Sequence, residues 1–135
     1  MALYPSEKLG GGTVGKFTVN MGGTVRYNIL LKKGDIVEFS IRVEGANYST
    51  MSGSTMKTLF TIPDGFLPDA SWVNSTYTDT SSIQGSILIT NAYMIETNNN
   101  QILNPWILFF EDGKVKSANN TYIKDLSISG CYIAK

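Results

Sequence analysis

The sequence predicts an all-β domain of about ten short strands, arranged as an antiparallel β-sandwich or a jelly-roll-like barrel. Three observations favour this fold class. Apolar residues recur at every second position in several segments, turn-forming residues separate these segments roughly every 8 to 12 residues, and no segment keeps a helical period. Only 16% of the residues are charged, so most of the polar residues are Ser, Thr and Asn, which favour turns and half-exposed strands.

The chain is expected to hold one domain with one core. Residues 1–12 contain Pro5 and three consecutive glycines and show no periodicity, so they are interpreted as a linker or N-terminal connector. Residues 13–135 are then a single β domain, since a chain of this length can bury one sizeable core.

The first strands are expected where apolar and polar residues alternate. Residues 17–21 and 25–31 show this two-residue period. The clearest case follows the turn at residues 32–35, where one face of the strand is apolar: Val37, Phe39, Ile41 and Val43. The pattern is typical of antiparallel strands with one buried and one wet face.

The middle of the chain is read as a loop at residues 47–53, a strand that ends at Ile62, and a turn at residues 63–68. Two prolines around an Asp-Gly pair place this last segment outside any central strand. Further strands are expected at residues 71–77, 85–90 and 92–95.

The last third begins with an Asn-rich loop at residues 96–104. The apolar segment 106–110 is expected to be a strand buried on both faces, and the turn 111–114 makes it one arm of a hairpin. After a strand at 115–117 and a second turn, residues 122–133 form the closing strand.

Composition excludes several kinds of chemistry. The chain has no His, which removes Ser-His-Asp and Cys-His catalysis and His-ligated zinc. No phosphate-binding loop is present. We therefore expect no enzyme, no metal and no cofactor, with a weak glycosidase that uses Asp79 or Glu96 as a minor alternative.

Charge and cysteine content bear on partners and location. Eleven basic and eleven acidic residues balance without a run of like charge, which argues against nucleic acid as a partner. No apolar run is long enough for membrane insertion, and no signal peptide is visible. The lone Cys131 cannot form an internal disulfide, so it is expected to be a buried strand thiol of a protein made in a reducing cytoplasm.

Aromatic and amide side chains in and near loops suggest saccharide binding, because a flat ring covers the apolar face of a pyranose while amide and carboxylate groups bind its hydroxyls. For the two tryptophans core packing is the competing interpretation, for the tyrosines the two interpretations weigh equally, and for the loop residues plain solvation is the default. The candidates for saccharide binding are Trp72, Tyr77, Asp79, Tyr93, Asn98 and Trp106.

Four segments carry a resemblance to a known family. They are the strand and turn at 57–68 (KTLFTIPDGFLP), the strand pair at 31–41 (LKKGDIVEFSI), the hairpin at 112–115 (DGKV) and the closing motif at 129–132 (SGCY). Together they resemble the C-terminal head domains of tail-fibre and baseplate proteins from phages of Gram-positive bacteria, and the receptor-binding proteins of lactococcal siphophages in particular.

The resemblance implies a homotrimeric β head at the tail tip or baseplate of a virion, made in the bacterial cytoplasm, that recognises host cell-wall saccharide beside other baseplate or tail proteins. Sugar-contacting residues vary within that family, so none is carried over to this chain. A structural tail or baseplate accessory domain that contacts only virion proteins is the alternative.

Overall fold

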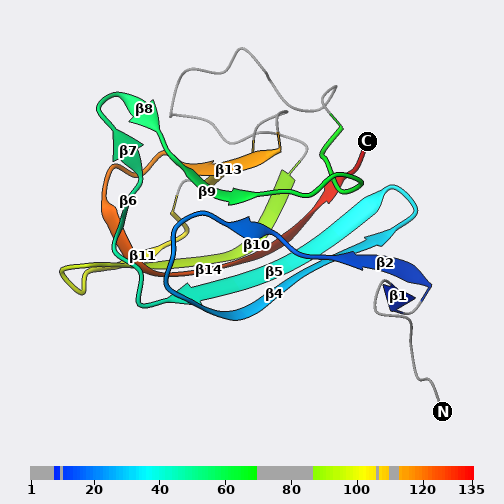
Figure 1. The fold of residues 1–135 in the computed structure, drawn as a ribbon, viewed down its shortest axis with the longest axis horizontal. Coiled ribbons are helices and arrows are strands. Elements are labelled where there is room, and N and C mark those ends of the chain that lie inside the picture. Colours follow the sequence, from blue (N-terminus) through cyan, green and yellow to red (C-terminus); the bar gives the residue numbers. More distant parts are fainter. Residues whose placement is uncertain (1–7, 10, 70–86, 106, 110–112) are drawn as a thin grey trace.

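The regular structure of this protein consists of β-strands alone in the part of the chain that can be described. The computed structural model describes residues 8–9, 11–69, 87–105, 107–109 and 113–135 of the 135-residue chain. Every strand pair in these ranges is antiparallel (Figure 1). The all-β class predicted from the sequence is confirmed.

An eight-stranded sheet, called the large sheet, forms one layer. Strand β6 (Tyr48–Ser49) pairs with β14 beside the main path of this sheet. The strands of the path, in spatial order, are β1 (Lys8–Leu9), β2 (Gly12–Gly15), β4 (Thr24–Lys33), β5 (Ile36–Glu44), β14 (Tyr122–Ile133), β10 (Ile87–Glu96) and β11 (Gln101–Leu103).

A four-stranded sheet, called the small sheet, covers one face of the large sheet (Figure 1). A separate two-stranded hairpin of β7 (Met51–Ser52) and β8 (Thr55–Met56) lies at one end. The strands of the small sheet, in spatial order, are β12 (Ile107–Phe109), β13 (Lys114–Ser117), β9 (Thr58–Thr61) and β3 (Thr18–Val19).

The core lies between the two sheets, as in a β-sandwich. Both layers contribute fully buried side chains, such as Ile41 and Ile128 from the large sheet and Phe60 from the small sheet. Phe17 joins the layers, because its ring lies 5.6 Å from that of Phe60 and 5.9 Å from that of Phe39. Burial of each such ring contributes about 1.5 to 3 kcal/mol.

The turn predicted at residues 63–68 is present and is tied to the end of the chain. Gly65 has a φ of 89°, and the Phe66 amide donates to the Pro63 carbonyl at 3.2 Å. The hydroxyl of the buried Tyr132 donates to the Phe66 carbonyl at 2.5 Å, and burial raises the pKa of Tyr132. The closing strand therefore holds this turn in place.

Three expectations about local structure are corrected. The predicted loop 47–53 contains β6 and β7, and the predicted loop 96–104 contains β11. Residues 87–96 form one strand, β10, with a register shift between Ile89 and Asn91 instead of a break. These strands have two or three residues each, too few to show an apolar period. Backbone pairing fixes β6 to β14, β11 to β10 and β7 to β8. The strand expected at 71–77 lies outside the described residues.

Candidate functional site

The large sheet has one face that points away from the small sheet, and this surface is called the outer face. On β4 the buried residue is Leu30, so its neighbours Ile29 and Leu31 point outward. Tyr27 lies on the same side and is 45% exposed. The apolar period of residues 25–31 is therefore divided: Tyr27, Ile29 and Leu31 lie on the outer face, whereas Val25, beyond the register shift, pairs with the buried Val43.

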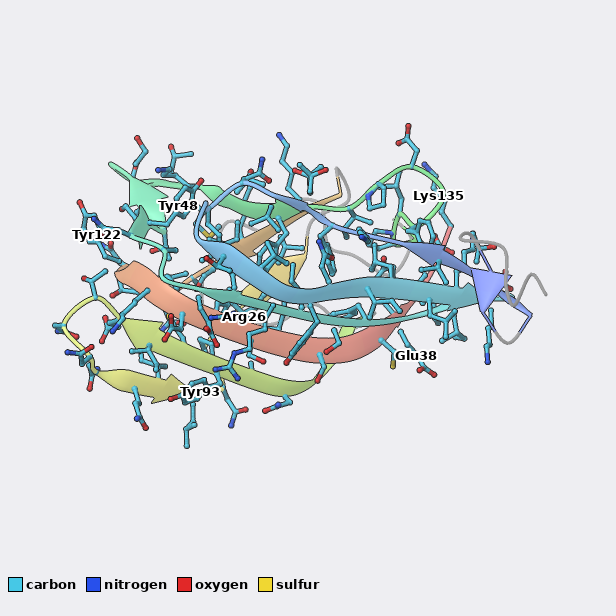
Figure 2. All side chains as sticks on the ribbon, turned by 60° about the horizontal axis from the view of Figure 1, so that its bottom comes forward. Arg26, Glu38, Tyr48, Tyr93, Tyr122 and Lys135 are labelled. Atoms are coloured by element: carbon cyan, nitrogen blue, oxygen red, sulfur yellow. The ribbon has the colours of Figure 1, made fainter. Side chains whose placement is uncertain are left out.

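The strand register brings one residue from each of five neighbouring strands into a line on the outer face. Tyr27 pairs with Arg42, Arg42 with Ser127, Ser127 with Tyr93, and Tyr93 with Leu103. This line, called the tyrosine row, crosses β4, β5, β14, β10 and β11. Figure 2 shows Tyr93 on the forward-turned side of the sheet together with Arg26 and Glu38.

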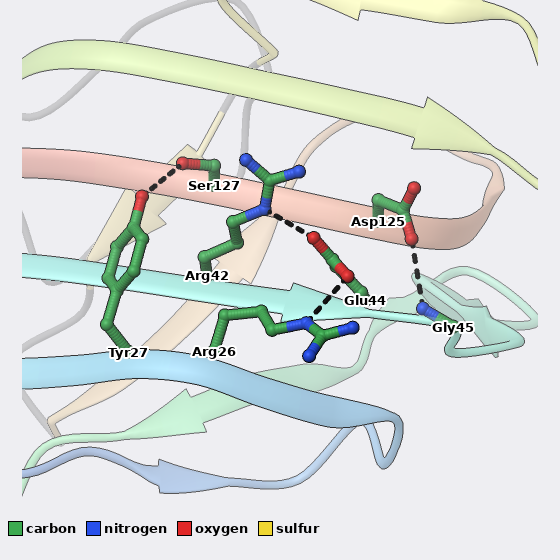
Figure 3. Close-up of polar contacts among 7 residues, drawn as sticks. All are labelled: Arg26, Tyr27, Arg42, Glu44, Gly45, Asp125 and Ser127. Carbon is green, nitrogen blue, oxygen red and sulfur yellow. Dashed lines mark hydrogen bonds and ion pairs between the residues drawn. The ribbon is translucent and has the colours of Figure 1, made fainter.

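The ring of Tyr27 reaches across β5 to the strand beyond it. Its hydroxyl hydrogen-bonds with the Ser127 hydroxyl at 3.1 Å (Figure 3). The bond anchors the far end of the ring, while almost half of the residue stays open to solvent. The result is an exposed aromatic surface with a fixed orientation, bordered by hydroxyl groups.

Two arginines beside Tyr27 share one carboxylate. The Nε of Arg26 donates to Glu44 Oε2 at 2.7 Å, and the Nε of Arg42 donates to Glu44 Oε1 at 2.8 Å (Figure 3). Arg26 can reach this face because the β4–β5 register shifts between Val25 and Tyr27. The hydrogen bond from Arg26 is the main reason that the pKa of Glu44 is lowered.

This arrangement fixes both guanidinium groups through Nε alone. Their terminal nitrogens point away from Glu44 in Figure 3. A guanidinium carries five N–H donors, so each arginine keeps donors for a ligand. Arg42 lies within the tyrosine row and would present these donors beside the ring of Tyr27.

The other end of the outer face is more apolar and is shallowly hollowed around Glu38. Cys131 borders one of these hollows and pairs in register with Glu38, so it lies half-buried on the outer face and not in the core as expected. Its neighbour Tyr132 points inward and is buried, as is Ile128 further along the strand. The two larger hollows have volumes of about 300 and 170 Å³ and are lined by Ile29, Leu31, Glu38, Phe39, Ser40, Ser129, Gly130 and Cys131.

Two of the six saccharide candidates from the sequence can be placed, and the structure does not bring them together. Tyr93 lies in the tyrosine row. Asn98 lies in the turn after β10, where its side-chain oxygen accepts a hydrogen bond from the Asn100 amide at 3.0 Å, so it builds the turn. The other four candidates lie outside the described residues: Trp72, Tyr77, Asp79 and Trp106.

Glu96 also shapes this turn. One of its carboxylate oxygens accepts a hydrogen bond from the Thr121 hydroxyl, and the other accepts from Asn100 Nδ2 at 2.6 Å. These bonds, the one from Thr121 first, lower the pKa of Glu96. The acid of a glycosidase needs the opposite shift. The environment of Glu96 therefore suits a residue that stabilises the turn.

Within the described ranges, no group of three or more Cys, Asp or Glu side chains is placed to hold a metal ion. Nor do these residues form any helix that is long and apolar enough to span a membrane.

Comparison of the chain with models of known protein families, with curated proteins and with solved structures found no match.

Proposed function

We propose that this chain is a non-enzymatic binding module that holds a saccharide on the outer face of its large sheet. The observation that carries the proposal is the ring of Tyr27, which is exposed and anchored by its bond to Ser127. An aromatic ring of this kind covers the apolar C–H face of a pyranose. Because the ring is already fixed, binding costs little side-chain entropy.

The groups around the ring match the remaining needs of a sugar. Arg42 supplies N–H donors, and the hydroxyls of Tyr27 and Ser127 both donate and accept. Such an open site remains wet, and water can complete the hydrogen bonds that the protein does not make. The zero net charge of the chain is compatible with an uncharged ligand.

The biological setting that we propose is host recognition by a phage tail or baseplate. This part rests on the resemblance of residues 31–41, 57–68, 112–115 and 129–132 to phage head domains. A homotrimer on the virion, in contact with other baseplate or tail proteins, follows from the same resemblance. The saccharide would then belong to the host cell wall.

A structural accessory domain that contacts only virion proteins is the second candidate. The observation in its favour is the apolar end of the outer face, where Ile36 is 45% exposed and lies near Leu31 and Ile133. Exposed apolar side chains that gather on one face are typical of protein contacts. On this alternative the face would meet another protein and would not bind sugar.

A glycan array probed with the purified chain tests the proposal. We expect binding to at least one cell-wall glycan, and we expect Tyr27→Ala to weaken it about tenfold or more without a change in melting temperature. Tyr122→Ala is the matched control, because Tyr122 is 56% exposed and lies at the far end of β14, outside the tyrosine row.

Failure to bind any glycan, together with capture of the chain by other purified tail or baseplate proteins, would favour the accessory domain. Equal weakening by Tyr27→Ala and Tyr122→Ala would keep saccharide binding but move it away from the tyrosine row.

A further inference from the structure

We infer that the outer face takes a linear oligosaccharide that runs across the strands, and not a single terminal sugar. This inference rests on the proposed function and adds the length and the direction of the ligand. It follows from the spacing and the chemistry of the tyrosine row.

The two tyrosines of the row stand far apart. Tyr27 is on β4 and Tyr93 is on β10, with β5 and β14 between them. Three strand spacings place their Cα atoms about 14 Å apart. The Tyr27 ring lies across the first two of these spacings, because its hydroxyl bonds with Ser127 on β14. A single pyranose stacked on this ring lies over β5, so a further sugar unit is needed to cover Tyr93 on β10. Only a chain of two or more sugars covers both rings.

The residues between the tyrosines suit the middle of such a chain. Arg42 and Ser127 are the intervening members of the row, and both carry hydrogen-bonding groups. Beyond Tyr93 the row ends at Leu103, which is 72% exposed. The strip therefore offers the Tyr27 ring with Arg42 beside it, the Ser127 hydroxyl at the end of that ring, the Tyr93 ring and an apolar end.

The surroundings of the row set the direction of the ligand. On one side the Arg26–Glu44–Arg42 ion pairs border the row. On the other side β4 presents the aliphatic Ile29 in the next row, opposite Ser40, and no ring. A chain laid along the strands would leave the aromatic contacts after one unit, whereas a chain laid across them keeps both.

The inference is tested with length series of defined saccharides. Chito-, malto- and cello-oligosaccharides, from the mono- to the hexasaccharide, are titrated calorimetrically into the intact chain, alongside the glycans that bind on the array. Within the series that binds, we expect affinity to rise at least about tenfold from the monosaccharide to the hexasaccharide and then to level off, because two aromatic contacts are gained.

Substitutions of Tyr93 test whether this residue makes the second aromatic contact. Tyr93→Ala should weaken hexasaccharide binding about three- to tenfold and leave monosaccharide binding unchanged. Tyr93→Leu preserves apolar bulk on β10 and should show the same loss of affinity, which guards against an effect of misfolding. Tyr122→Ala should change neither.

The outcomes separate the inference from the proposed function. Equal affinity for monosaccharide and hexasaccharide, or an equal loss of both in Tyr93→Ala, overturns the inference while saccharide binding stands. If no saccharide of the series or of the array binds, the proposed function falls and the inference falls with it.

Discussion

Glu44 is the residue that holds the two arginines of the candidate site in place. Its two carboxylate oxygens each accept a hydrogen bond from a different arginine, one on β4 and one on β5. Exposed ion pairs contribute little to the free energy of unfolding. The contribution of Glu44 is therefore mainly geometric, since it fixes Arg42 beside the ring of Tyr27.

The ion pairs of Glu44 should make stability depend on pH. The pKa of Glu44 in the folded state lies below the usual glutamate value of 4.5, chiefly because Arg26 donates to the carboxylate. The stabilisation is therefore present above the unfolded pKa and is lost as the pH falls through the folded pKa. We expect the melting temperature of Glu44→Gln to lie slightly below that of the wild type at neutral pH. The difference should shrink as the pH drops below 4.5.

Thermal denaturation of both proteins across this pH range measures the effect. Glu38→Gln is the control, because Glu38 is an exposed carboxylate of the same face with no ion pair among the described residues. A difference between wild type and Glu44→Gln that stays constant with pH would contradict the assignment.

The bond between Tyr27 and Ser127 should matter for binding more than for stability. Tyr27→Phe and Ser127→Ala each remove the same 3.1 Å hydrogen bond from an exposed site, so each should change the free energy of unfolding by less than about 0.5 kcal/mol. Both should weaken saccharide binding by a similar factor, smaller than that of Tyr27→Ala, because the ring remains but is no longer anchored.

Calorimetric titration of the two single variants and the double variant checks this coupling. The double variant should lose less affinity than the sum of the two single variants, since the bond between the hydroxyls is already lost in either one. Additive losses would show that the two hydroxyls act independently.

At the scale of elements, strand β4 shows what a local pattern can and cannot predict. The alternation over residues 37–43 marks the core face of β5, since Val37, Phe39, Ile41 and Val43 are all buried. A similar alternation over residues 27–31 marks the outer face of β4 instead, while Val25, beyond the register shift, pairs with the buried Val43. The alternation predicts that the segment is a strand, but only the cross-strand register decides which side of the strand faces the second sheet.

Among the polar residues of β4, Asn28 should be the one whose substitution destabilises the fold most. The backbone pairing of β2 with β4 ends at Leu30. Beyond it the Asn28 side chain makes the hydrogen bonds between the two segments: its Oδ1 accepts from the Phe17 amide at 2.9 Å, and its Nδ2 donates to the Phe17 carbonyl at 2.8 Å. Asn28→Ala leaves both backbone groups without this partner, so we expect a loss of about 1 to 3 kcal/mol in the free energy of unfolding.

Urea denaturation measures this loss. Asn91→Ala is the matched control, since Asn91 is an exposed residue of β10, and it should change stability by less than about 0.5 kcal/mol. Equal effects of the two substitutions would mean that Asn28 does not hold the Phe17 segment in place.

At the scale of the whole molecule, the fold class was accessible from sequence because it depends on periodicity and turns alone. The candidate site was not, since it joins residues from position 27 to position 127 through the register of five strands. Tyr93 was predicted from its residue type. Tyr27, Arg42 and Ser127 were missed because each lies within a strand, where an aromatic or polar residue signals nothing until its face is known.

The proposed trimer is a property of the whole molecule and has its own test. Sedimentation equilibrium or light scattering of the intact chain should give a mass three times that of one chain. The measurement includes a reductant, because the lone half-buried Cys131 could otherwise link two chains through a disulfide. A monomer at micromolar concentration would contradict the trimer and would weaken the phage-head part of the proposal.

The central claim is that the outer face is the saccharide site, and NMR mapping tests it most directly. Backbone amide spectra of the isotope-labelled chain are recorded during titration with the oligosaccharide that binds most tightly on the array. The account predicts that the largest shifts fall on the tyrosine row, at Tyr27, Arg42, Ser127 and Tyr93. Shifts confined to the Asn-rich turns at 97–100 and 118–120, with none on the row, would contradict it.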